Sequence, residues 1–206
     1  MKRSARKILI VLAYLALALG LCGCSLETSA ENLFTLPQVP VEYTGLANTL
    51  NTYLESGYEY ITPSSGNNIQ SLQMIDMDGD GEKEAVAFFR HTADDNPLKI
   101  LFFREENGTF SLYSTIESGG SSIDSVSFRD FNGDGRLEVV VGWRVSTEVQ
   151  TVAVYELVPN QVNMLMQSGY LRYVVDDLDS DGWFDLLLIR SEAEGGCLAE
   201  HYVWQD

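Results

Sequence analysis

The feature that most constrains the fold is an acidic loop that occurs three times, each time directly before an apolar run. The loops begin at Asp76, Asp130 and Asp177, so their starts are 54 and 47 residues apart. Each loop has Asp or Asn at positions 1, 3 and 5, Gly at position 6 and an acid at position 9. Self-similarity at a nearly fixed period indicates a repeat architecture in which one supersecondary unit recurs.

The segments between the loops have room for four strands of ordinary length in each repeat. The apolar run after each loop is typical of a strand buried on both faces, whereas the segment before each loop alternates apolar and polar residues. Predicted strands cover 84–90, 98–104, 110–116 and 123–129 in the first repeat, and 138–144, 150–157, 161–167 and 170–176 in the second. Four antiparallel strands in about 50 residues describe a blade of a β-propeller.

The third repeat is shorter, because its predicted strands at 185–190 and 198–204 are two of the expected four. Before the first repeat, apolar residues recur at helical spacing, which predicts a short amphipathic helix over 45–56 with Thr44 as its N-terminal cap. The predicted fold class is all-β: propeller-type four-stranded blades in about two and a half repeats, an incomplete ring, preceded by a short helix. Such a chain is a piece of a longer protein, or it closes as an oligomer or an open stack.

The N-terminus has the features of a secretory signal peptide. A basic start without acids is followed by an apolar run from Ile8 to Leu21, which is shorter than the roughly 20 residues of a transmembrane helix. The end of this run, Leu21-Cys22-Gly23-Cys24, resembles the lipobox of bacterial lipoprotein signals. The resemblance implies cleavage before Cys24, acylation of its thiol, and anchoring at the extracellular face of the cell membrane.

The chain is therefore predicted to have three parts: a lipoprotein signal peptide at 1–23, a lipid-anchored tether at 24–42 and the repeat domain at 43–206. Removing 1–23 takes away four of the 13 Lys and Arg residues and none of the 30 acids, which leaves a net charge of −21. Such a surface repels nucleic acid and favours divalent cations where acids cluster. With Cys24 acylated, Cys197 has no intramolecular partner, so we expect no disulfide framework and a small, buried Cys197.

The spacing of the acids within each loop predicts a calcium site. Side chains at positions 1, 3 and 5 converge because the backbone curls around one point, and Gly at position 6 permits the sharp turn. Calcium takes oxygen ligands, including a backbone carbonyl at position 7, whereas Mg²⁺ demands stricter geometry and keeps its waters. Without a cation the carboxylates repel one another over a few Å, and a bound cation reverses the sign of that interaction.

The loops are not EF-hands. An EF-hand has Glu at position 12, but here that position holds Ala87, Val141 and Leu188, each inside a predicted strand. The pattern resembles the FG-GAP/VCBS-type repeats of the integrin α-subunit N-terminal propeller, in which the loop joins two strands and binds calcium through positions 1, 3, 5 and 9 and the carbonyl of position 7. The resemblance covers about 69–206, and the Phe-Gly-Gly-Ala-Pro segment that names the family is absent.

The resemblance implies three calcium sites with matching ligands. They are Asp76, Asp78, Asp80, Glu84 and the carbonyl of Glu82 in site one; Asp130, Asn132, Asp134, Glu138 and the carbonyl of Arg136 in site two; and Asp177, Asp179, Asp181, Asp185 and the carbonyl of Trp183 in site three. Because Asn132 is uncharged, site two is expected to bind calcium more weakly than the other two. Glu at position 9 of sites one and two is longer than the Asp of site three.

These features predict a calcium-binding, membrane-anchored extracellular module that binds a protein or polysaccharide, is of the adhesion type and has no catalytic activity. Two alternatives stay open: an accessory subunit of an envelope complex whose partner supplies the missing strands, and a propeller enzyme acting on polysaccharide. Catalysis is disfavoured because the two histidines, His91 and His201, have no evident nucleophile beside them. Four aromatic residues within the strands are expected in the core rather than on a sugar-binding platform: Trp143, Tyr155, Tyr202 and Trp204.

Overall fold

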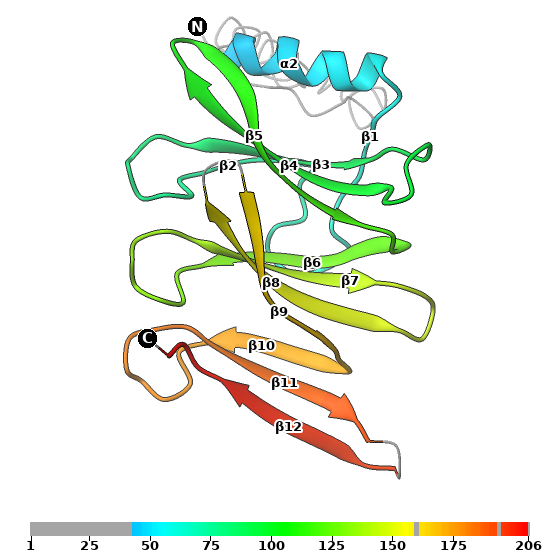
Figure 1. The fold of residues 1–206 in the computed structure, drawn as a ribbon, viewed down its shortest axis with the longest axis vertical. Coiled ribbons are helices and arrows are strands. Elements are labelled where there is room, and N and C mark those ends of the chain that lie inside the picture. The colour runs from blue at the N-terminus through cyan, green and yellow to red at the C-terminus, as the bar shows by residue number, and fades with distance from the viewer. Residues whose placement is uncertain (1–42, 159–160, 193–194, 206) are drawn as a thin grey trace, which may run out of the picture. The chain divides into compact units, whose positions relative to one another are not determined.

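The computed structural model describes residues 43–158, 161–192 and 195–205 (Figure 1). These residues belong to one compact unit, 39–206. The predicted signal peptide, the tether and the acylation site Cys24 lie outside the described residues, so their assignments stay predictions. Within the described ranges, no helix has the length and the hydropathy of a transmembrane segment.

Helix α2 (Thr44–Glu55) matches the predicted helix to within one residue at each end. Thr44 was expected to cap this helix, but it lies inside the first turn, and the N-cap is Tyr43, whose side chain makes no capping hydrogen bond. Leu46 and Leu50 are one helical turn apart and are buried in a cluster with residues of β3 and β4. Helix α2 therefore covers one face of the first sheet.

The strands form three antiparallel sheets (Figure 1). Sheet one contains β1 (Glu59–Tyr60), β2 (Leu72–Ile75), β3 (Glu84–Arg90), β4 (Leu98–Glu106) and β5 (Thr109–Ser118), and both β1 and β2 pair with β3. Sheet two contains β6 (Ser122–Arg129), β7 (Glu138–Arg144), β8 (Gln150–Val158) and β9 (Gln161–Gly169). Sheet three contains β10 (Arg172–Asp176), β11 (Asp185–Ser191) and β12 (Cys197–Tyr202).

The sheets are offset by one strand from the repeats as grouped from the sequence. The strand at 123–129 was predicted to belong to the first repeat, and the strand at 170–176 to the second. In the structure β6 pairs with β7, and β10 pairs with β11. The physical reason is that each acidic loop is a short connection, which brings the strand before it and the strand after it together as antiparallel neighbours. Each loop therefore belongs to a single sheet.

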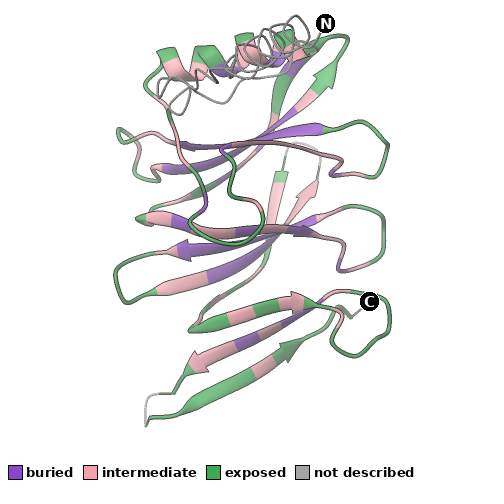
Figure 2. Cartoon of the chain, turned by 180° about the vertical axis from the view of Figure 1, so that it is seen from behind, coloured by how far each residue is buried: buried purple, intermediate pink, exposed green. Residues whose placement is uncertain are grey.

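The three sheets stack face to face, with the buried residues concentrated between them (Figure 2). Val86 of β3 lies in one core cluster with Val139 and Val141 of β7. On the opposite face of β7, Val140 lies in a second cluster with Leu186 of β11. Strands β3 and β7 are buried along nearly their whole length, which confirms for loops one and two the prediction that the following strand has two covered faces. The prediction is wrong for β11 after loop three, where Leu187 and Ile189 are only half-buried.

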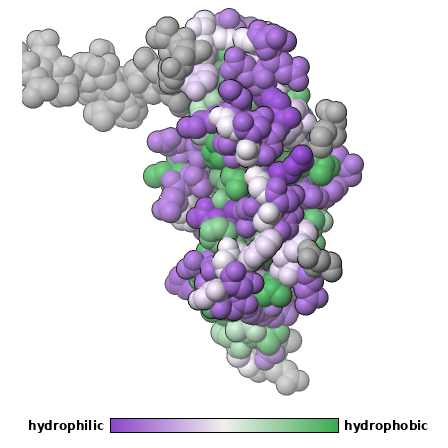
Figure 3. All heavy atoms as spheres, turned by 90° about the vertical axis from the view of Figure 1, so that its left-hand side faces the viewer, coloured by the Kyte–Doolittle hydropathy of each residue, from purple (hydrophilic) through white to green (hydrophobic). Residues whose placement is uncertain are grey.

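Sheet three has three strands, and no described element covers the face that it turns away from sheet two. Val174 of β10 is 48% exposed, and Leu187 and Ile189 of β11 are half-buried. Apolar residues are accordingly visible at the lower end of the surface in Figure 3, over sheet three. The described residues thus form an incomplete propeller, as the sequence predicts, without a closed ring.

The uncovered face and open edge of sheet three explain the burial predictions that were wrong. Cys197 was expected to be buried, but it is exposed on β12 because no sheet lies over it. Tyr202 and Trp204 were also expected in the core, but they are exposed at the open edge of sheet three, where they line a groove next to sheet two. Trp143 and Tyr155 are buried as predicted because they lie on β7 and β8 of the central sheet.

Candidate metal centre

Each acidic loop joins two neighbouring strands of one sheet, and its first residue holds the loop in its curl. In loop one (76–84), the carboxylate of Asp76 accepts hydrogen bonds from the N–H groups of Gly79 and Gly81 at 2.8 and 3.1 Å. Asp130 accepts the corresponding two bonds in loop two (130–138). The turn needs a left-handed backbone, so Gly79 and Gly81 have φ angles of 74° and 92°. In loop three (177–185), Ser180 takes the place of Gly79 with a φ of 66°.

The acid at position 9 is the most buried charged group of each loop. Glu84, Glu138 and Asp185 are 2%, 1% and 2% exposed. Each accepts a hydrogen bond from the backbone N–H of position 2 in its own loop, at 2.8, 2.8 and 3.0 Å. Because a buried carboxylate is costly unless it is paired, this bond fixes the acid and ties the end of the loop to its beginning.

The folding of the loops brings acids together in two of the three sites. In site one, oxygens of Asp76, Asp78 and Glu84 lie within 4.8 Å of one another, and in site three oxygens of Asp177, Asp179 and Asp185 do the same. One oxygen in each group, Oδ1 of Asp78 and Oδ1 of Asp177, is buried and has no hydrogen-bond partner. Buried polar atoms nearly always have a partner, so these orphaned oxygens fit a cation.

The acids at position 5 are oriented differently from the expectation. Asp80 and Asp181 lie outside the two groups, and Oδ1 of each accepts the N–H of the residue two positions later, at 2.8 and 2.9 Å. These local bonds give the aspartates a role in shaping the turn. The carbonyl ligands expected at Glu82, Arg136 and Trp183 stay predictions.

Site two differs in charge from the other two. Asn132 stands at position 3, and its side-chain oxygen accepts the N–H of Asp134 at 3.0 Å. Burial, together with the charges of Asp134, Asp130 and Glu156, raises the pKa of Glu138 to about 7. The carboxylates of loop two therefore repel one another, and a cation would relieve that repulsion.

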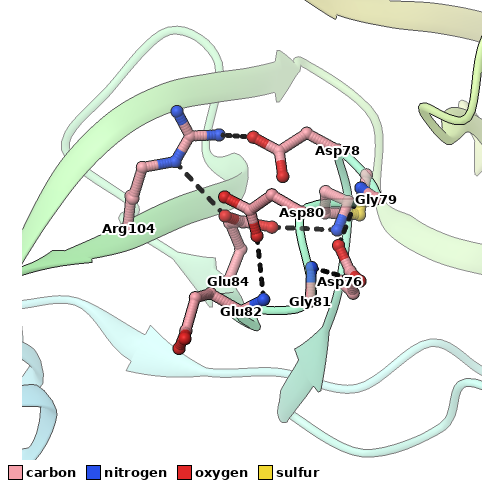
Figure 4. Close-up of polar contacts among 9 residues, drawn as sticks. Asp76, Asp78, Gly79, Asp80, Gly81, Glu82, Glu84 and Arg104 are labelled. Atoms are coloured by element: carbon pink, nitrogen blue, oxygen red, sulfur yellow. Dashed lines mark hydrogen bonds and ion pairs between the residues drawn. The ribbon is translucent and has the colours of Figure 1, made fainter.

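A basic side chain that could not be foreseen from the loop spacing lies against loop one (Figure 4). Arg104 of β4 donates from Nη2 to Oδ2 of Asp78 at 2.5 Å and from Nε to Oε1 of Glu84 at 3.2 Å. Burial raises the pKa of Glu84, and the charge of Arg104 opposes that rise. Comparison of the repeats could have found this residue, because the positions that follow Phe103, Tyr155 and Tyr202 differ in charge.

Neither histidine contacts a serine or cysteine nucleophile within the described part of the chain. His91 stacks on the ring of Tyr58, with 4.5 Å between ring centres, and lies 3.1 Å from a carboxylate oxygen of Asp94. Nε2 of His201 lies 3.1 Å from Oδ2 of the loop-three acid Asp185. His91 is thus a packing residue, and His201 borders the candidate metal site.

Comparison with known proteins connects this geometry to a family. A search of curated proteins found no match. Residues 76–141 match the family model described as FG-GAP-like repeat. The matched segment begins at the first acid of loop one and ends within β7, so it contains loops one and two, whereas loop three lies outside it. The segment from Asp76 to Val141 is therefore similar to an FG-GAP-like repeat, in agreement with the resemblance read from the sequence.

Proposed function

We propose that this protein is a calcium-binding module without catalytic activity, anchored at the extracellular face of the cell membrane, where it binds a protein or polysaccharide. The observation that carries the proposal is the convergence of acids in loop three, where a buried oxygen of Asp177 has no hydrogen-bond partner. The FG-GAP-like match supports it, because domains built from such repeats are generally non-catalytic binding modules.

The chain's own residues supply what a calcium ion needs. Hard oxygen donors at positions 1, 3, 5 and 9 and the carbonyl at position 7 match the ligand preference of calcium. The position-9 acid is already held by a backbone N–H in every loop, so little ordering of this side chain remains for binding. When bound, calcium supplies the positive charge that offsets the repulsion among the carboxylates.

Calcium added to the metal-stripped, full-length chain in detergent should be taken up and should raise the thermal unfolding midpoint. At free calcium ten times the dissociation constant, each occupied site adds about 1.4 kcal/mol to the free energy of unfolding. Titration calorimetry and thermal unfolding followed by circular dichroism measure the two effects. The variant Asp177→Asn should lose one ion, whereas Asp95→Asn, which removes an acid outside the loops, should bind as the parent does. A folded protein without uptake or a shift in midpoint would contradict the proposal.

The membrane anchor is the second part of the proposal, and it depends on the lipobox-like Leu21-Cys22-Gly23-Cys24. Two or more acyl chains hold a protein on a membrane stably, whereas one binds marginally. In bacteria fed labelled palmitate, the full-length chain should incorporate label and sediment with membranes. Cys24→Ser should abolish labelling and Cys22→Ser should leave it intact. Labelling that survives the first substitution would disprove acylation at Cys24.

The edge of sheet three favours a second candidate function, that of an accessory subunit whose partner adds a strand. In sheet two, β9 pairs with β8, but no described strand pairs with the outer edge of β12. Beside that edge lies a mainly apolar groove of about 190 Å³, lined by residues that include Val154, Met166 and Trp204. An unpaired strand next to apolar pockets suits strand addition. Light scattering of the full-length chain tests this idea, since an oligomer favours it and a stable, well-folded monomer opposes it.

A further inference from the structure

The three sheets place one residue at the same point beside each acidic loop. Across the β3–β4 pair, Phe103 lies opposite Ala85, which directly follows the position-9 acid of loop one. The same register places Tyr155 opposite Val139 in sheet two, and Tyr202 opposite Leu186 in sheet three. The residue after each of these aromatic side chains is Arg104, Glu156 and Val203, respectively. One structural position thus carries a positive charge, a negative charge and an apolar side chain in turn.

Arg104 is held against loop one by three contacts. Its guanidinium lies between Asp78 and Glu84, with contacts of 2.5 and 3.2 Å (Figure 4). Its other side faces the ring of Tyr113, with 4.8 Å between the guanidinium carbon and the ring centre. Such stacking and two-point pairing are the geometry for which arginine is suited. The guanidinium is therefore a fixed part of the loop rather than a mobile surface charge.

These contacts use the oxygens that a calcium ion would need. One oxygen of Glu84 accepts from Arg104 and the other accepts from the N–H of Met77, so both are occupied. One oxygen of Asp78 is also occupied, and only its Oδ1 has no partner. A calcium ion in site one would have to displace the guanidinium from both carboxylates or bind close to a like charge. Site one therefore does not fit calcium while Arg104 keeps these contacts.

The other two loops have no permanently charged cation of this kind, although His201, which is a cation only when protonated, lies 3.1 Å from Asp185 of loop three. Within the described residues, no Lys or Arg side chain lies within ion-pair distance of an acid of loop two or loop three. Glu156 instead adds a negative charge that acts on Glu138. Loop two therefore has a further acid, and not a counter-ion, at the position that Arg104 holds beside loop one.

We propose that Arg104 is a built-in counter-ion that takes the place of calcium in loop one, so that calcium loads loops two and three only. This inference rests on the proposed calcium-binding function and adds to it the identity of the occupied sites. It also gives Asp78 and Glu84 of loop one a positively charged partner at every calcium concentration, whereas the loops of sheets two and three depend on the ion. The arginine thereby sets which end of the repeat array responds to calcium.

Titration calorimetry of the metal-stripped, full-length chain in detergent tests this assignment by counting ions. The parent chain should take up two calcium ions and Arg104→Gln should take up three. The reverse change, Glu156→Arg, should lower the count from two to one by placing the counter-ion beside loop two. Arg144→Gln serves as the matched control, because Arg144 pairs with Asp124 outside the loops, 3.1 Å away, and the count should stay at two.

The outcomes separate this inference from the proposed function. Three ions in the parent chain, with no gain in Arg104→Gln, would overturn the counter-ion role and leave calcium binding intact. No uptake by any variant would overturn both. Circular dichroism identifies a variant that fails to fold, and in that event the parent count and Glu156→Arg still decide the question. A count of two in the parent that falls to one in Glu156→Arg supports the inference without Arg104→Gln.

Discussion

Replacing Gly79 by alanine is expected to destabilise the metal-free protein by about 3 kcal/mol, combining left-handed backbone strain with overpacking. Gly79 has a φ of 74°, which an alanine adopts only with strain. A Cβ at this position would also lie 2.6 Å from the carbonyl oxygen of Gly135 in loop two. That oxygen belongs to the backbone, so it cannot move aside as a flexible side chain would.

Gly81→Ala is the matched control for this experiment. Gly81 lies in the same loop with a φ of 92°, but a Cβ there would meet nothing within 4 Å. The Gly81→Ala substitution should therefore lower the free energy of unfolding only through backbone strain, by about 1 kcal/mol. Urea unfolding of the full-length chain in the presence of a chelator measures both variants. Equal costs for the two substitutions would show that loops one and two do not contact each other in solution.

The expected difference between the two variants reflects direct stacking of the loops. The carbonyl of Met77 in loop one accepts a hydrogen bond from the N–H of Leu137 in loop two at 2.9 Å. The Trp183 ring of loop three lies where a Cβ of Gly133 would be, at 2.1 Å. In loop three the corresponding position holds Ser180, which is exposed and carries a side chain in a left-handed conformation. Glycine is thus needed where a following loop stacks, and no described loop follows the third.

Strand positions could be predicted from the sequence because the acidic loops frame them. The predicted strands 84–90 and 138–144 coincide with β3 and β7, since each begins at a position-9 acid and ends at an arginine. The grouping of strands into sheets could not be predicted in the same way. Periodicity gives the faces of a strand but not its partner, so the strands before loops two and three were assigned to the wrong sheets. The exposure of Cys197 was missed for a related reason, because burial depends on what covers sheet three.

The candidate site was predictable where its ligands follow one another in a single loop. Spacing alone brings Asp76, Asp78 and Glu84 together, and the structure places their oxygens within 4.8 Å. Spacing could not show that Asp80 turns an oxygen to its own backbone, since that depends on the exact path of the turn. It also gave no indication of Arg104, which reaches the loop from the neighbouring strand 20 residues after Glu84. Contacts across a sheet depend on strand register, and register became visible only with the pairing of β3 and β4.

Raising the pH from 5 to 8 is expected to destabilise the metal-free protein through Glu138, by about 2.5 kcal/mol for this one group. Burial, with a smaller contribution from the charges of Asp134 and Asp130, raises the pKa of Glu138 from 4.5 to about 7. The folded state therefore binds the Glu138 proton more tightly than the unfolded state does. The stabilisation is present below pH 4.5, falls as the unfolded chain loses its proton, and is gone above pH 7.

The pH effect is isolated by comparing the full-length chain with Glu138→Gln, which keeps an oxygen to accept the N–H of Phe131. Urea unfolding in chelator at pH 5 and pH 8 should show a larger loss of stability in the parent than in this variant. Glu148→Gln, which changes an exposed acid, should behave as the parent does. Saturating calcium should remove the difference, because a cation favours the ionised carboxylate. The prediction is wrong if the stability of the parent chain and that of Glu138→Gln depend on pH in the same way in chelator. Glu138 would then ionise in the folded state as readily as in the unfolded chain, and loop two would tolerate its buried charge without a cation.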